Sequence, residues 1–75
     1  MDIRKLFGAN VRRYPSVLGI SQAALAERMG VDRAHISLIE RGMQNATLLT
    51  IWEASQALGV QPVVLLAPSP SDSEV

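Results

Sequence analysis

The chain has 75 residues, of which 48% are hydrophobic and 4% aromatic, with no cysteine and a formal net charge of zero. This length predicts one small domain and leaves no room for a deep enzyme cleft. The absence of cysteine excludes disulfides, thiolate metal sites and cysteine nucleophiles. We expect a cytoplasmic protein, because the sequence shows neither the roughly 20-residue apolar run of a membrane span nor the apolar stretch of a signal peptide.

The charges are distributed unevenly. All seven basic side chains precede residue 42, and residues 1–66 hold five of the seven acidic ones, so this part carries a net charge of +2. The remaining residues carry −2 and are rich in proline and serine. The sequence therefore predicts a mildly basic domain at residues 1–67, followed by a flexible polar tail at 68–75.

The first predicted helix begins after Asp2, whose side chain suits the N-cap position. Apolar side chains then recur with the period of a helix and form one inward stripe at Ile3, Leu6, Phe7, Val11 and Tyr14. Pro15 lacks an amide hydrogen and biases the preceding residue away from the helical conformation. We expect the helix to stop or bend at residues 14–16, with 16–19 as a connector.

Residues 20–42, ISQAALAERMGVDRAHISLIERG, are predicted to form two short helices. Ser21 is the expected N-cap of the first helix, at about 22–29, and Asp32 is that of the second. Gly30 supplies the left-handed residue that ends the first helix at little steric cost. The side chains expected to face inward are Leu25, Ala26 and Met29 from the first helix, and Ile36 and Ile39 from the second.

The second of these helices is expected to run to about Arg41, with Gly42 as its stop. Its polar side would project outward, away from the two inward isoleucines. Such a pair of helices is a helix-turn-helix. An α-helix fits the major groove of B-DNA, where the N-terminal residues of the second helix reach base edges.

A fourth helix is predicted between the N-cap Thr47 and the stop Gly59, with Leu48, Ile51, Ser55 and Leu58 facing inward. The next segment, VQPVVLLAP, suits a short helix that begins at Pro62 and packs Val63 and Leu66 inward. The β-branched pair Val63–Val64 would equally suit a strand. We favour the helix, because a single short strand would have no partner within the chain.

Residues 3–66 resemble the phage-repressor and Cro-like helix-turn-helix family, the XRE type. The resemblance depends on GISQAALAERMGVDRAHISLIERG at 19–42, NATL at 45–48 and ALGV at 57–60. The stretch VDRAHISLIERG, followed by QNATL, is similar to controller proteins of restriction–modification systems. The resemblance implies an all-α, five-helix lambda-repressor-like DNA-binding domain. It also implies a transcriptional regulator that binds a palindromic operator as a homodimer.

The expected DNA-contacting residues are Gln22, Arg33, Ala34, His35, Ser37, Leu38, Arg41, Gln44 and Asn45. The resemblance implies that Gln22 contacts a phosphate at the N-terminus of its helix. Arg33 is the expected base reader, because a guanidinium can bond O6 and N7 of guanine together, and a phosphate contact is its alternative. Ala34 and Leu38 can offer apolar contact, for instance with a thymine methyl group.

Two positions depart from the family pattern. The place near the end of the first helix that often holds an arginine, paired with the glutamate that matches Glu40, is Pro15 here. Glu40 is therefore expected to pair with an arginine at position 12, 13 or 41, or to stay solvated. Leu38 stands where relatives often have a polar residue that contacts a base.

Leu49 and Trp52 lie beside the inward stripe of the fourth helix, so they either fill the core or form a dimer interface. The interface would also include Val63 and Val64. The alternative function is an antitoxin-like subunit whose main partner is another protein, with residues 62–66 as a strand shared between subunits.

Neither an enzyme nor a metal site is predicted. The sequence has no paired carboxylates on one helix face, no nucleophile with a base at suitable spacing and no glycine-rich phosphate loop. His35, the only histidine, has only Asp32 within one turn, and that carboxylate is expected to cap a helix. We expect double-stranded DNA as the partner, and no cofactor, small-molecule ligand or membrane.

Overall fold

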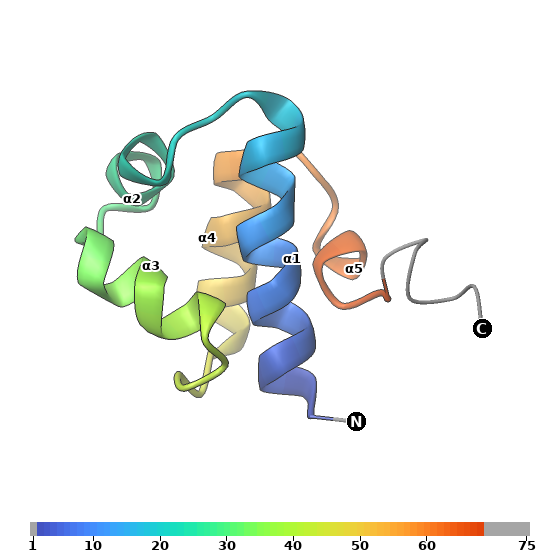
Figure 1. Ribbon diagram of the computed structural model, residues 1–75. Helices are drawn as coiled ribbons and strands as arrows, with labels where there is room; N and C mark the ends of the chain where they lie inside the picture. The colour runs from blue at the N-terminus through green and yellow to red at the C-terminus, as the bar shows by residue number, and fades with distance from the viewer. Residues whose placement is uncertain (1, 69–75) are drawn as a thin grey trace.

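The computed structural model describes residues 2–68, which form five helices and no strand (Figure 1). These helices are α1 (Ile3–Leu18), α2 (Gln22–Met29), α3 (Arg33–Glu40), α4 (Leu48–Leu58) and α5 (Pro62–Leu65). α1 and α4 are in contact in the middle, α2 and α3 pack on one side of them, and α5 packs on the other. The expected all-α, five-helix fold is confirmed. Of the predicted tail, residues 69–75 lie outside the described residues.

Side-chain oxygens cap the first four helices as expected. The side chain of Asp2 accepts a hydrogen bond from the amide of Arg4, Ser21 from that of Ala24, Asp32 from that of His35, and Thr47 from that of Thr50, all at 3.0–3.1 Å. Each bond satisfies one amide that a helix leaves unpaired in its first turn. At Asp2, the hydrogen bond from the Arg4 side chain, followed by the Arg4 amide bond, holds the pKa of the carboxyl below its usual value.

Of the stop or bend expected at residues 14–16, the stop is wrong, as is the connector at 16–19, because α1 continues through Pro15 to Leu18. Proline lacks the amide hydrogen for one hydrogen bond of the helix. Pro15 is buried, so the packing of its ring offsets that loss and the helix continues. α1 ends at Gly19, whose φ of +73° is a left-handed conformation that glycine adopts without strain. The amide of Ile20 closes the last turn by donating to the carbonyl of Pro15 at 2.7 Å.

All five helices contribute apolar side chains to one core. Its buried members are Phe7, Val11, Leu25, Ala26, Met29, Ile36, Ile39, Ala54, Ala57, Leu58 and Leu65. The five inward residues predicted for α2 and α3 are confirmed. Three other predictions are wrong, because Ile3, Leu48 and Val63 are 55%, 87% and 64% exposed. Each of these lies in the first turn of its helix, at the edge of the core.

The segment at 62–66 is helical, as favoured, although its inward residue is Leu65. Pro62 takes the first helical position, where a missing amide hydrogen costs nothing. Asn10 of α1, which is 1% exposed, holds this segment in place. Its Nδ2 donates to the carbonyl oxygens of Leu65 and Ala67, both at 2.8 Å. These bonds satisfy carbonyls that a four-residue helix leaves unpaired at its end.

α1 meets the C-terminal end of α3 at Gly8. A β-carbon built at Gly8 would overlap the carbonyl oxygen of Ile39 and lie 3.0 Å from that of Glu40. Glycine inside a helix costs about 0.5–1 kcal/mol relative to alanine, so the close approach of two backbones is the benefit that offsets it. The position of α3 is therefore set by direct backbone contact with α1.

Candidate nucleic-acid interface

The predicted sharp turn between α2 and α3 is present. Gly30 has a φ of +73°, and the amide of Val31 donates to the carbonyl of Ala26 at 3.0 Å. Ile36 and Ile39 then anchor α3 in the core, at 1% and 2% exposed. Burial of each isoleucine stabilises the fold by about 1.5–3 kcal/mol. One side of α3 is thereby fixed inward, which leaves the opposite side facing solvent.

The solvent-facing side of α3 carries most of the predicted DNA-contacting residues. We define the α3 surface as Arg33, Ala34, His35, Ser37 and Leu38. Arg33, Ala34 and Ser37 are exposed, whereas His35 and Leu38 are partly buried. Residues four apart share a helix face, so Arg33 lies over Ser37 and Ala34 over Leu38. The result is a polar row beside an apolar row on one outward ridge.

Three further predicted residues follow α3 and flank its C-terminal end. Arg41 is exposed, and its Nε donates to the carbonyl of Ser37 at 3.4 Å. A cation is favourable there because it lies at a helix C-terminus. Gln44 is partly buried, whereas Asn45 is exposed and its Oδ1 accepts from Nη1 of Arg4 at 3.4 Å. The Asn45 bond engages the amide oxygen and not the NH₂ group.

The expected arginine partner of Glu40 is wrong, because Gln22 bonds this carboxylate instead. Nε2 of Gln22 donates to Oε1 of Glu40 at 2.6 Å and to Oε2 at 2.8 Å. The bond joins the first residue of α2 to the last residue of α3. Within residues 2–68 the one ion pair joins Asp2 and Arg4, so no arginine reaches Glu40.

A second exposed surface is apolar and lies on α4 and α5. We define the α4–α5 surface as Leu48, Leu49, Trp52 and Val63, which are 87%, 64%, 53% and 64% exposed. Because Leu49 and Trp52 are more than half exposed, they do not fill the core as one alternative required. The neighbouring Val64 is partly buried. Sequence analysis missed Leu48, although its place one turn before Trp52 marks the same helix face.

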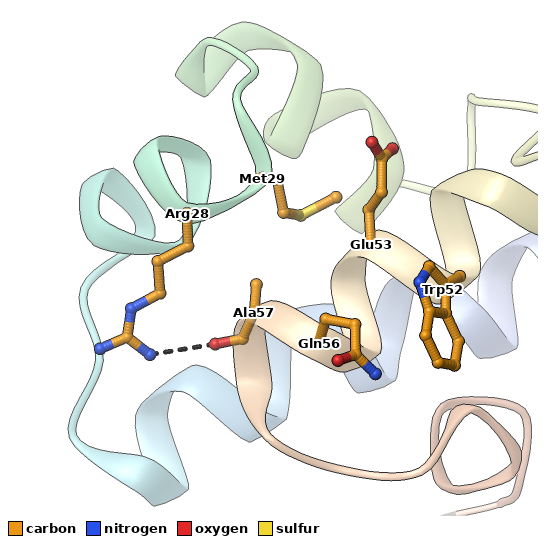
Figure 2. Close-up of a pocket in the computed structure, with 6 residues that line it drawn as sticks. All are labelled: Arg28, Met29, Trp52, Glu53, Gln56 and Ala57. Carbon is orange, nitrogen blue, oxygen red and sulfur yellow. Dashed lines mark hydrogen bonds between the residues drawn. The ribbon is translucent and has the colours of Figure 1, made fainter.

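An open groove of about 520 Å³ lies where α2 meets α4, and Trp52 is one of its lining residues (Figure 2). Arg28 of α2 reaches towards α4, where its Nη1 donates to the carbonyl of Ala57 at 3.0 Å. This carbonyl lies near the C-terminal end of α4, which favours a cation. The guanidinium of Arg28 therefore links α2 to α4 and does not belong to the α3 surface.

The described residues limit two other kinds of site. No group of three His, Cys, Asp or Glu side chains within residues 2–68 is placed to hold a metal ion. None of the five helices combines the length and the apolar character needed to cross a membrane.

A helix-turn-helix family model matches residues 18–65, which include α2, the turn at Gly30, and α3. The chain belongs to the helix-turn-helix family. It is 41% identical to an uncharacterised HTH-type transcriptional regulator, y4dJ, from Sinorhizobium fredii, over 92% of this chain and 90% of the relative. It is 47% identical to the control protein C.BamHI from Bacillus amyloliquefaciens, over 87% of this chain and 82% of the relative.

A solved structure shares the fold of this helix-turn-helix protein. The restriction–modification controller protein C.AhdI from Aeromonas hydrophila matches it with a TM-score of 0.78 and 34% identity, over 83% of this chain and 94% of the other. The resemblance to phage-repressor-like and controller proteins is therefore confirmed. The family is one of DNA-binding transcriptional regulators and not a class of enzymes.

Proposed function

We propose that the protein is a sequence-specific regulator that binds a palindromic operator as a homodimer, with α3 in the major groove. The observation that carries this proposal is the outward α3 surface, supported by the buried anchors Ile36 and Ile39. In this docking the N-terminal residues of the second helix of the motif meet base edges. Two protomers would place their α3 helices in half-sites about 34 Å apart.

Each residue of the α3 surface has a role that its chemistry suits. Arg33, in the first turn of α3, bonds O6 and N7 of a guanine. Ala34 and Leu38 form the apolar row and contact thymine methyl groups. His35 and Ser37 bond base edges or phosphates, because both side chains can donate and accept hydrogen bonds.

Phosphate contacts on either side of α3 fix the register of the protein on the duplex. Gln22 lies at the N-terminus of α2, where the helix dipole favours an anion. Because its Nε2 is bonded to Glu40, its backbone amide is the donor proposed for the phosphate. Arg41, Gln44 and Asn45 supply donors after the end of α3. The NH₂ group of Asn45 is directed to this role, since its oxygen is engaged by Arg4.

The α4–α5 surface, with Val64 beside it, is the proposed dimer interface. Its four members are large, apolar and more than half exposed. An exposed apolar cluster of this kind is typical of a protein–protein interaction surface. A second copy is the proposed occupant, because a palindromic operator requires two equivalent protomers. The helical form of α5 removes the shared strand on which the antitoxin-like alternative depended.

Selection of bound duplexes from a random pool tests the proposal. We expect one enriched sequence with two-fold symmetry and half-sites one helical turn apart. The absence of any enriched sequence would refute sequence-specific binding, and an asymmetric site would refute the symmetric dimer.

Sedimentation of paired variants tests the interface. Trp52→Gln and Leu49→Gln together are expected to give a monomer at concentrations at which the protein is a dimer. Because a monomer binds one half-site at a time, operator binding should weaken by roughly 100-fold or more. Leu18→Gln is the matched control, because Leu18 is also an exposed apolar residue, at 46%, but lies on α1 and outside the proposed binding surfaces. Unchanged dimerisation of the Trp52 and Leu49 variant would place the interface elsewhere.

A further inference from the structure

A basic pocket lies between the outer side of α1 and the last turn of α3. It has a volume of about 430 Å³ and is lined by Ala9, Arg12, Arg13, Ser16 and Val17 from α1, and by Glu40 from α3. The α1 residues follow the three- and four-residue spacing that places side chains on one helix face. The sequence indicates the two arginines only as possible partners of Glu40.

The two guanidinium groups of this pocket have no anionic partner among the residues that the structure describes. Within residues 2–68, neither Arg12 nor Arg13 forms an ion pair, although both line the same pocket as Glu40. Nε of Arg13 is buried and has no hydrogen-bond partner among those residues. The guanidinium of Arg13 lies over the ring of Tyr14, 4.5 Å from its centre, which holds the group in place.

We propose that Arg12 and Arg13 bind a backbone phosphate of the DNA that flanks the half-site read by α3. This inference rests on the proposed function. Glu40 on the rim of the pocket is hydrogen-bonded to Gln22, so the pocket lies next to the N-terminus of α2. The first helix of the motif crosses the DNA backbone when the second enters the groove, which brings phosphates to this end of α2.

The chemistry of the pocket suits a phosphate oxygen. Guanidinium groups bond phosphates through paired, charge-assisted hydrogen bonds, and the Ser16 hydroxyl adds a donor on the same helix face. The two positive charges also outweigh the negative charge of Glu40, which would otherwise repel the duplex. A contact of this kind carries no base information, so it raises affinity for every sequence alike.

The salt dependence of binding tests the inference. Arg12→Gln removes one phosphate contact from each protomer, so the slope of log K against log salt should become shallower by about 1.8 in the dimer. If the variant and the unaltered protein bind equally at 1 M salt, this difference in slope makes the variant bind about 30-fold more weakly at 0.15 M salt. Arg12→Lys should restore most of the slope, because the charge is kept. Thermal melting should show both variants folded, since Arg12 is exposed.

Arg28→Gln is the matched control, because it removes the same charge from the far end of α2. Its slope should equal that of the unaltered protein. A slope reduced equally by Arg28→Gln would mean that only net charge matters, which would overturn the local contact.

Duplex length locates the contact. With a duplex that extends beyond both half-sites, Arg12→Gln should bind more weakly than the unaltered protein, and with one cut at the half-site edges the two should bind equally. An unchanged slope in Arg12→Gln, with normal salt dependence of the unaltered protein, would overturn this inference and leave the proposed function intact. Failure of the unaltered protein to bind any duplex would remove both.

Discussion

The α3 surface and the α4–α5 surface are both exposed, but α1 supports them in different ways. At α3 the support is backbone against backbone, because Gly8 admits the carbonyls of Ile39 and Glu40 at contact distance. At α5 the support is one side chain, Asn10, which bonds two carbonyls. A backbone contact has no rotamer to vary, so it fixes orientation more strictly. The helix that we propose to read base edges is the one held in this way.

The two surfaces also differ in chemistry. The α3 surface places an arginine, a histidine and a serine beside two apolar residues, whereas the α4–α5 surface has no charged or polar member apart from the indole nitrogen of Trp52. Base edges offer both hydrogen-bonding groups and thymine methyls, which the mixed ridge of α3 can match. An apolar cluster gains most from covering by another apolar cluster. This difference supports the proposed roles, with nucleic acid on the α3 surface and a second protomer on the α4–α5 surface.

Gly8→Ala should break the support of α3 and have the largest effect. The added methyl group would meet backbone atoms of α3 that no rotamer change can move, so α1 and α3 must separate. We expect the free energy of unfolding in urea to fall by about 3 kcal/mol, the upper end of the usual cost of overpacking. Ser16→Ala, at an exposed position of α1, is the control and should change stability by less than about 0.5 kcal/mol. Normal stability of Gly8→Ala would contradict the backbone crossing.

Asn10→Ala should loosen the other support. It leaves the carbonyls of Leu65 and Ala67 without their donor, and the free energy of unfolding should fall by about 1–3 kcal/mol. Because α5 carries part of the α4–α5 surface, dimerisation measured by sedimentation should weaken as well, while base preference at saturating protein stays the same. Asn45→Ala, an exposed asparagine, should leave stability unchanged. A change in base preference in Asn10→Ala would show that the two supports are not separate.

A double-mutant cycle of Gln22→Ala and Glu40→Ala sharpens the account of the α3 side. The two hydrogen bonds join α2 to α3 at their outer ends, so the two substitutions should not be additive. We expect a coupling of about 0.5–1.5 kcal/mol from urea unfolding, towards the lower end because the pair is exposed. Additive effects would show that the bond contributes nothing in solution.

Local signals were sufficient to predict most of the fold. Caps at Ser21, Asp32 and Thr47, together with glycine stops, placed three helices, because each signal acts within one turn of the chain. The end of the first helix could not be predicted at Pro15, because the sequence shows the lost hydrogen bond but not that the proline ring is buried in the fold. Inward residues were wrong only in first turns, where a helical period continues past the edge of the core.

The surroundings of the candidate site were less predictable. The residues of the α3 surface follow from the two anchors Ile36 and Ile39, since the opposite side of a helix must face outward. The partner of Glu40 did not follow, because the bond from Gln22 depends on the angle between two helices. Contacts between residues far apart in the chain, such as those of Gly8 and Asn10, likewise arise only from tertiary packing.

The central claim is that α3 reads base edges, and the base preference of Arg33→Ala tests it most directly. Duplexes selected from a random pool by this variant are compared with those selected by the unaltered protein. We predict that the variant loses preference at one position of each half-site, where discrimination falls by about 1–3 kcal/mol, and keeps it elsewhere. A loss of affinity that is equal for all sequences would contradict the claim and make Arg33 a phosphate contact.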